Sequence, residues 1–199
     1  MNLKKIILAF SLLISMNSIA QNEIRIGVKG GVNLSGLHTQ FGTTTSNQGL
    51  NIGGIFELEL NNSLSLYTEL LYNKKGGVFY PENTKSSTNI SLDTELHYLD
   101  IPIQVKFSFL NKLSIDFGPQ IGFLLNSKGI IGNSISDNGK EVKFSNTNSI
   151  EFALNGGFSY KLSNALILQS RYSYGMTKVF KNERVKNSVI SLSIGYFFN

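Results

Sequence analysis

The most reactive side chains of this 199-residue chain are carboxylates and amines, because it contains no cysteine and only two histidines. The lack of cysteine excludes a disulfide framework, a cysteine-based zinc site and a thiol nucleophile. Glu57 and Glu59 stand two residues apart, and paired carboxylates can perform acid–base catalysis. Neutralisation across a protein interior by Arg25, Lys29 or Arg171 is the ordinary alternative, and we favour it. We therefore expect no catalytic role for these carboxylates.

Residues 1–20 have the layout of a secretory signal peptide. Lys4 and Lys5 precede an apolar run over 6–14, and small residues stand at the cleavage-determining positions. The run is shorter than the roughly 20 residues that a membrane-spanning helix requires. We expect residues 21–199 to form one domain. Without Lys4 and Lys5 that domain has 16 basic and 13 acidic residues, and a net charge of +3 is too mild to indicate a nucleic-acid partner.

Alternation of apolar and polar residues with a period of two recurs along the rest of the chain and predicts eight strands. The expected strands cover residues 24–36, 49–60, 64–74, 95–109, 113–126, 148–162, 165–178 and 188–198. Three connections are tight, whereas four are long and polar, at 37–48, 75–94, 127–147 and 179–187. Short and long connections alternate strictly, which is typical of an up-and-down meander with one plain and one elaborate end.

Each predicted strand has one apolar and one polar face. We assign every charge within the strands to the polar face and expect none on the apolar face. The charges on the polar face form a candidate lumen network of five basic and six acidic residues: Arg25, Lys29, Glu57, Glu59, Glu69, Asp100, Lys106, Asp116, Glu151, Lys161 and Arg171. Pro102 lies on the same face, and because proline cannot donate to a ladder we expect a local bulge there.

The volume of the side chains decides which face is inside. A soluble lipocalin-like barrel would show the same alternation with its apolar face inward. The apolar face, however, holds about forty large side chains, far more than the interior of an eight-stranded barrel accommodates. That face must therefore point into lipid, and the sheet must close, because an open edge in hydrocarbon leaves backbone groups unpaired. The expected fold is all-β: an eight-stranded antiparallel up-and-down transmembrane β-barrel with a narrow polar lumen.

Outward-facing aromatic residues support this orientation. They gather near the short-turn rim (Phe107, Phe109, Phe158, Tyr160, Tyr196 and Phe198) and near the opposite rim (Tyr72, Phe123, Tyr172 and Tyr174). Two aromatic girdles around an aliphatic band are typical of outer-membrane barrels. In such barrels the short turns face the periplasm, so we expect the four long connections to be extracellular.

Three segments, 98–103 (YLDIPI), 118–122 (GPQIG) and 193–198 (SIGYFF), resemble the PorT-type outer-membrane β-barrel family, which is abundant in Bacteroidota. The resemblance covers essentially the whole mature chain. It implies a location in the bacterial outer membrane, and an accessory role in secretion or gliding as for a few family members. The last strand, with Tyr196 and Phe198, resembles the signal read by the barrel-assembly machinery, which is therefore an expected partner during biogenesis.

The histidines indicate neither catalysis nor metal binding. His97 has the outward position of the histidine in lipid-modifying barrels, but its expected neighbours Tyr72, Phe123 and Leu125 offer neither a serine-type hydroxyl nor a carboxylate. We interpret His97 as an interfacial side chain. His38 falls in a long connection without a partner. We therefore expect no catalytic residue, no metal and no cofactor, and a lipid-modifying enzyme is the least favoured function.

The last long connection is basic, with a net charge of +3 from four cations against Glu183: Lys178, Lys181, Arg184 and Lys186. These residues are candidates for contact with lipopolysaccharide phosphates, and a merely solvated loop is the alternative. Outer-membrane lipid and lipopolysaccharide are thus expected partners, together with an unidentified extracellular or secretion-system partner. We favour a structural or interaction role through the extracellular loops, and the alternative is a narrow porin-like solute pore.

Overall fold

Strands make up most of the chain that the computed structural model describes, namely residues 23–38, 43–80, 90–133, 136–144, 146–181 and 185–198. The expected signal peptide lies outside these residues. The strands are β1 (Ile24–His38), β2 (Thr43–Asn61), β3 (Leu64–Tyr80), β4 (Ile90–Leu110), β5 (Leu113–Asn133), β6 (Ser136–Lys143), β7 (Ile150–Lys161), β8 (Leu166–Gly175) and β9 (Lys186–Phe197). No helix in the described part of the chain is long and apolar enough to cross a membrane.

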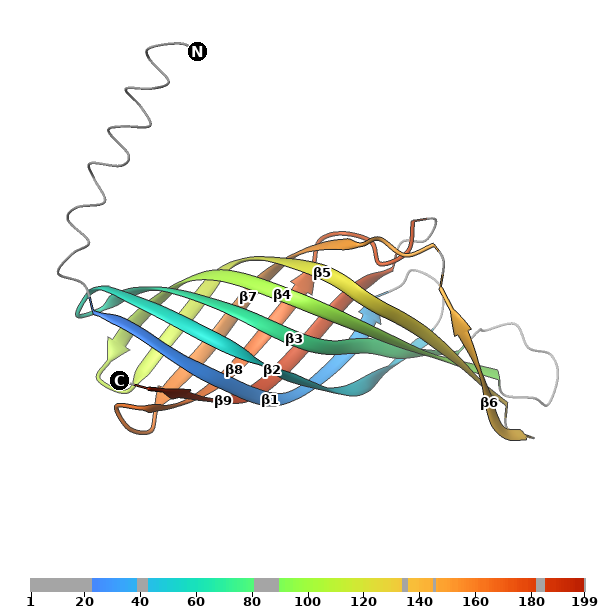
Figure 1. Ribbon diagram of the computed structural model, residues 1–199, viewed down its shortest axis with the longest axis horizontal. Coiled ribbons are helices and arrows are strands. Elements are labelled where there is room, and N and C mark those ends of the chain that lie inside the picture. Colours follow the sequence, from blue (N-terminus) through green and yellow to red (C-terminus); the bar gives the residue numbers. More distant parts are fainter. Residues whose placement is uncertain are drawn as a thin grey trace, which may run out of the picture.

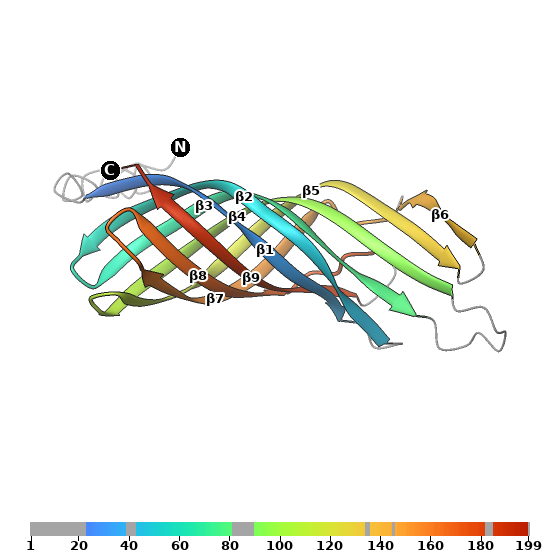
Figure 2. The same ribbon diagram turned by 90° about the horizontal axis from the view of Figure 1, so that it is seen from below.

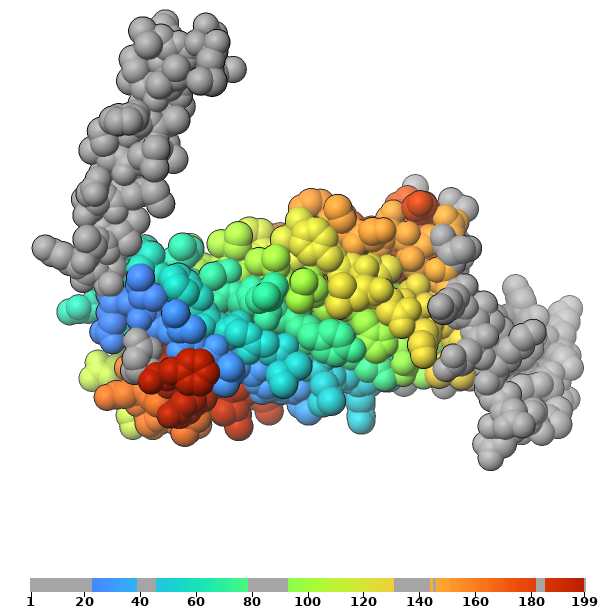
Figure 3. Space-filling model, in the orientation of Figure 1, coloured from blue at the N-terminus to red at the C-terminus, as the bar shows by residue number. Residues whose placement is uncertain are grey.

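Eight of the strands close into an antiparallel barrel in the order β1-β2-β3-β4-β5-β7-β8-β9 (Figure 1). Closure is completed by β9 and β1, which pair from Gly27↔Phe197 to His38↔Lys186. Figure 3 shows this seam at one end of the barrel, where the red end of the chain lies against the blue β1. The predicted eight-stranded antiparallel barrel is confirmed, and its short β-turns and both ends of the described chain lie at the same rim.

Several strands are longer than predicted at the opposite rim. β3 runs to Tyr80, β4 begins at Ile90 and β5 reaches Asn133, so the expected loops at 75–94 and 127–147 are partly strands. The additional strand β6 pairs with β5 outside the closed barrel and projects from this rim (Figure 2). These segments are rich in polar residues. Above a membrane both faces of a sheet can contact water, so strands can pair there without alternating apolar and polar residues. The periodicity of the sequence therefore did not predict these strand extensions.

Proline does not distort the sheet where a bulge was expected. The β4–β5 register is the same at Pro102↔Gln120 and at Val105↔Phe117, and the shifts occur instead at His97/Tyr98 and Ser108/Leu110. The prediction of a bulge at Pro102 was therefore wrong. The missing proline N–H interrupts the ladder without inserting a residue, and only an inserted residue changes the register.

The outer surface of the barrel is apolar over its middle. Leu192 and Ile194 of β9 have exposed fractions of 50% and 55%, and aromatic side chains such as Phe158 and Phe198 lie toward the short-turn rim at 64% and 63%. The expectation that this face carries no charge was wrong at one place. Lys74 and Glu95, neighbours on β3 and β4 near the opposite rim, form an ion pair on the outside of the barrel. The strands extend beyond the apolar band at this rim, so these charged side chains lie outside the hydrocarbon region.

Candidate functional site

The interior of the barrel holds most of the charges that the sequence assigns to its polar face. Nine of the eleven are buried: Arg25, Lys29, Glu57, Glu69, Asp100, Lys106, Asp116, Glu151 and Arg171. Glu59 and Lys161 are partly exposed at the short-turn rim. Alternate residues of each strand point inward, so the strands deliver these side chains at successive levels along the barrel axis.

A central charge cluster, defined by Lys29, Glu69, Asp116 and Arg171, fills the middle of the lumen. Arg171 donates to both carboxylate oxygens of Glu69, at 2.6 and 2.8 Å, and Lys29 Nζ lies 2.8 Å from Glu69 Oε1. Asp116 accepts a hydrogen bond from Gln104 at 2.7 Å and lies 3.8 Å from Arg171 Nε. Two cations therefore face two anions, and bidentate geometry makes the Arg171–Glu69 pair the strongest contact of the cluster.

An outer charge cluster, defined by Lys75, Asp100 and Glu151, lies nearer the long-loop end. Lys75 Nζ is 2.8 Å from Asp100 and 2.6 Å from Glu151, and all three side chains are buried. Asn73 and Asn187 donate to the two carboxylates, each at 2.6 Å. Lys75 was missed as a lumen residue because the predicted strand stopped at residue 74. Parity was the available signal, since Lys75 continues the inward series of β3.

Two apolar clusters close the lumen beyond these charges. An apolar ring of Ile55, Tyr67, Ile167 and Phe197 lies toward the short-turn end. An apolar cap of Leu37, Leu96, Tyr98, Val179 and Val185 lies at the long-loop end. The segment between β8 and β9 supplies Val179, whose amide and carbonyl bond to Val185 and Asn148 at 2.8 Å each. Both clusters exclude water. The sequence suggested a polar lumen, but the lumen is apolar at these two levels.

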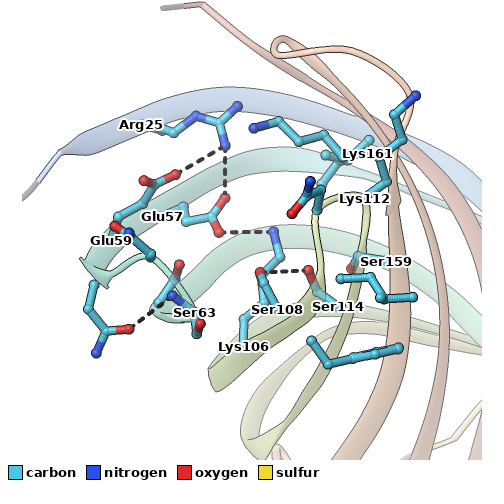
Figure 4. A pocket seen from close by; sticks show the side chains of 17 residues that line it. Arg25, Glu57, Glu59, Ser63, Lys106, Ser108, Lys112, Ser114, Ser159 and Lys161 are labelled. Atoms are coloured by element: carbon cyan, nitrogen blue, oxygen red, sulfur yellow. Dashed lines mark hydrogen bonds and ion pairs between the residues drawn. The ribbon is translucent and has the colours of Figure 1, made fainter.

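The short-turn end opens into a mouth cavity of about 470 Å³. Its lining includes Arg25, Glu57, Glu59, Ser65, Lys106, Ser108, Lys112, Ser114, Ser159 and Lys161 (Figure 4). Glu57 pairs with Lys106 at 2.9 Å and with Arg25 at 3.4 Å, and Glu59 pairs with Arg25 at 3.6 Å. Arg25 thus pairs with both Glu57 and Glu59, as the sequence analysis allowed. Lys29 and Arg171, the other two cations considered there, contact Glu69 instead.

The two histidines lie on the outside of the barrel near the long-loop rim. The Tyr72 hydroxyl is 2.6 Å from His97 Nδ1, and Glu95 Oε2 is 3.9 Å from His97 Nε2. A carboxylate is therefore present beside His97, contrary to the sequence interpretation, but the hydroxyl belongs to tyrosine. His38 is the last residue of β1 rather than a loop residue, and its ring lies 6.0 Å from that of Tyr174.

The basic segment between β8 and β9 reaches the surface at the long-loop end. Lys178 and Lys181 are exposed, whereas Lys186 is half-buried with its Nζ 5.5 Å from the Tyr174 ring. Arg184 lies outside the described residues. The structure thus separates two solvent-facing cations from one that packs against an aromatic ring.

A closed antiparallel barrel with an apolar exterior and buried charges inside is the architecture of an integral outer-membrane protein. Residues 19–181 match the family model described as outer membrane protein beta-barrel domain, and the chain belongs to this family. The protein is thus located in the bacterial outer membrane, surrounded by lipid and lipopolysaccharide. Outer-membrane barrels have short periplasmic turns and longer extracellular loops, so the mouth cavity faces the periplasm.

Solved structures with the same fold include Ail, the attachment invasion locus protein of Yersinia pestis. It is 16% identical, with a TM-score of 0.54 over 88% of this chain and 99% of that chain. Ail in complex with the heparin analogue sucrose octasulfate gives 17% identity and a TM-score of 0.52 over 88% and 99% of the two chains. Neisserial surface protein A gives 13% identity and a TM-score of 0.48 over 86% and 96%. No curated protein matches the chain.

Proposed function

We propose that this protein is a closed, non-conducting outer-membrane barrel that acts through its extracellular end. The observation that carries the proposal is the obstruction of the lumen at successive levels. The apolar ring, the central and outer charge clusters and the apolar cap follow one another along the barrel axis, and each is made of buried side chains. A solute would have to separate paired charges and displace apolar side chains at each level.

The space left inside the charged region is too small for a solute. A cavity between the two charge clusters, lined by Lys29, Asn73, Lys75 and Arg171 among others, has a volume of about 10 Å³. This is room for about one water molecule. A narrow porin-like pore, the alternative drawn from the sequence, requires a continuous water path past these residues.

Single-channel recording tests the closed state. The mature chain refolded into a planar bilayer is expected to show no stable, discrete current. Separating the paired charges would leave unpaired polar groups in a low-dielectric lumen, which is energetically costly. Circular dichroism and heat-modifiable gel migration verify folding beforehand, and a porin inserted in the same way verifies the recording. Stable unitary currents from the folded barrel would contradict the proposal and make solute passage the leading function.

The exposed cations of the segment between β8 and β9 support a contact with polyanions at the extracellular end. Lys178 and Lys181 project from the rim where outer-leaflet lipopolysaccharide lies, and ammonium groups bind phosphate as compact point charges. Ail, which shares the fold, has been crystallised with a sulfated heparin analogue. We assign the same class of ligand, phosphate or sulfate groups on a saccharide, to Lys178, Lys181, Arg184 and Lys186.

A charge-neutral variant tests this contact. Lys178→Gln/Lys181→Gln is expected to weaken binding of purified lipopolysaccharide about tenfold, since each charge-assisted contact contributes roughly 0.5–1 kcal/mol at an exposed site. Lys112→Gln, at the periplasmic end, is the control, and it is expected to leave binding unchanged when lipopolysaccharide is presented only to the extracellular face of the barrel in vesicles. Tight binding that persists in the double variant, or binding that survives removal of the lipopolysaccharide phosphates, would argue for a solvated loop without this role.

A narrower assignment follows from the resemblance to the PorT-type family. This resemblance supports an accessory role in secretion or gliding, with a secretion-system or extracellular partner. It also supports a role without enzymatic activity. The exposed aromatic side chains Tyr196 and Phe198, whose rings meet edge to face with centroids 6.0 Å apart, are proposed as the signal for the barrel-assembly machinery. Both lie on the outside of the barrel, where an insertion machinery has access to them.

A further inference from the structure

The periplasmic mouth cavity carries an excess of positive charge. Four cations line it, Arg25, Lys106, Lys112 and Lys161, and two anions, Glu57 and Glu59, so its net charge is +2. The carboxylates lie on the same side as Arg25, and Lys112, Lys161 and Ser159 lie on the opposite side (Figure 4). The positive excess is therefore concentrated on one wall.

Two of the cations are free to bind a ligand. Arg25 and Lys106 are already held by Glu57, and they also lie over the rings of Phe197 at 4.0 Å and Tyr67 at 5.2 Å. Lys112 and Lys161, in contrast, form no ion pair with any residue in the described part of the chain.

Hydroxyl groups complete the wall beside these lysines. Ser108, Ser114 and Ser159 come from three different strands, and the Ser108 and Ser114 hydroxyls are 2.9 Å apart. Ser159 donates to Asp116 at 3.2 Å, which orients its side chain. The hydroxyl hydrogen of Ser159 is thus already used, but within the Ser108–Ser114 pair one hydroxyl keeps its hydrogen for a ligand. Two ammonium groups together with this hydroxyl donor match the lone pairs of an oxyanion, whereas they offer little to a cation or an apolar molecule.

The cavity is closed at its inner end and is large enough for a small-molecule ligand. Ile167 lines it and also belongs to the apolar ring, so the ring forms its inner boundary and a molecule must enter and leave on the periplasmic side. A volume of about 470 Å³ falls within the range of small-molecule sites. We propose that the mouth cavity binds an oxyanion, a carboxylate or phosphate group, carried by a small periplasmic molecule.

Titration of the whole refolded barrel tests this site. Isotope-labelled protein in a non-ionic, phosphate-free detergent is titrated with sodium phosphate and, separately, with sodium acetate, while sodium chloride keeps the ionic strength constant. Saturable shifts are expected at the backbone amides of residues 108–114 and 159–161, and shifts at Lys178 or Lys181 are fitted separately because they report binding at the extracellular end. Saturation by phosphate alone or by acetate alone identifies which oxyanion the cavity prefers.

A matched pair of variants separates a built site from general attraction to a basic protein. Lys112→Gln/Lys161→Gln is expected to weaken binding at least about tenfold, because it removes both unpaired charges. Lys178→Gln/Lys181→Gln removes the same charge at the extracellular end and is expected to leave the affinity measured at the amides of residues 108–114 and 159–161 unchanged. Shifts that fail to saturate with either anion, or equal affinity in the two double variants, would overturn the proposal without bearing on the extracellular role.

Discussion

Glu69→Gln is expected to lower the free energy of unfolding by about 3–5 kcal/mol, the cost of removing one partner from a buried ion pair. Glu69 is fully buried and accepts two hydrogen bonds from Arg171, at 2.6 and 2.8 Å, and one from Lys29 at 2.8 Å. Glutamine has nearly the same shape but no charge. Lys29 and Arg171 would then face each other in the lumen with Asp116 as their remaining counter-charge, 3.8 Å from Arg171.

Urea titration in lipid vesicles measures this effect, followed by circular dichroism because the chain has no tryptophan. Glu59→Gln is the matched control. The Glu59 side chain is 36% exposed and 3.6 Å from Arg25, so its loss is expected to cost less than about 1 kcal/mol. Equal costs for the two variants would show that the central charge cluster does not stabilise the barrel as its geometry implies.

Leu192→Arg is expected to destabilise the folded barrel in lipid by about 2–4 kcal/mol, the cost of arginine on the lipid face near the bilayer midplane. Leu192 has half of its surface exposed and lies in the middle of β9, opposite Val32 of β1 and Ser170 of β8. Its side chain must therefore contact acyl chains. The same substitution at Ile194, also exposed on this face, is expected to have a similar effect.

A substitution at a different depth in the bilayer is the control for this prediction, and it is measured with the same unfolding assay. Tyr196→Arg places the same charge on the same face of β9 but near the short-turn rim, where the cost falls to about 0–1 kcal/mol. Unchanged stability of Leu192→Arg in vesicles would mean that this face does not meet lipid. A large cost at Tyr196 would instead place the rim deeper in the bilayer than the aromatic girdle indicates.

The barrel itself could be predicted from the sequence, because the direction of a side chain along a strand is a local property. Alternation in 113–126 and 188–198 identified the inward and outward faces there, and side-chain volume alone placed the apolar face in lipid. Alternation also directed Glu69, Asp116 and Arg171 to one face before any pairing was known. The chain thus determines locally which residues the lumen receives.

Only the tertiary structure decided which of these residues meet. Whether Glu69 contacts Arg171 or Arg25 depends on strand pairing and stagger around the closed barrel, and these bring together residues 102 positions apart in the chain. The outer charge cluster needs Lys75, which lies in a polar segment that becomes a strand because β4 pairs with it and β2 pairs with its distal part. Packing of Val179 into the apolar cap at the long-loop end likewise depends on contacts between distant segments. Periodicity records the environment of each residue but not its partner, so the closed lumen and the mouth cavity emerge only when the sheet closes.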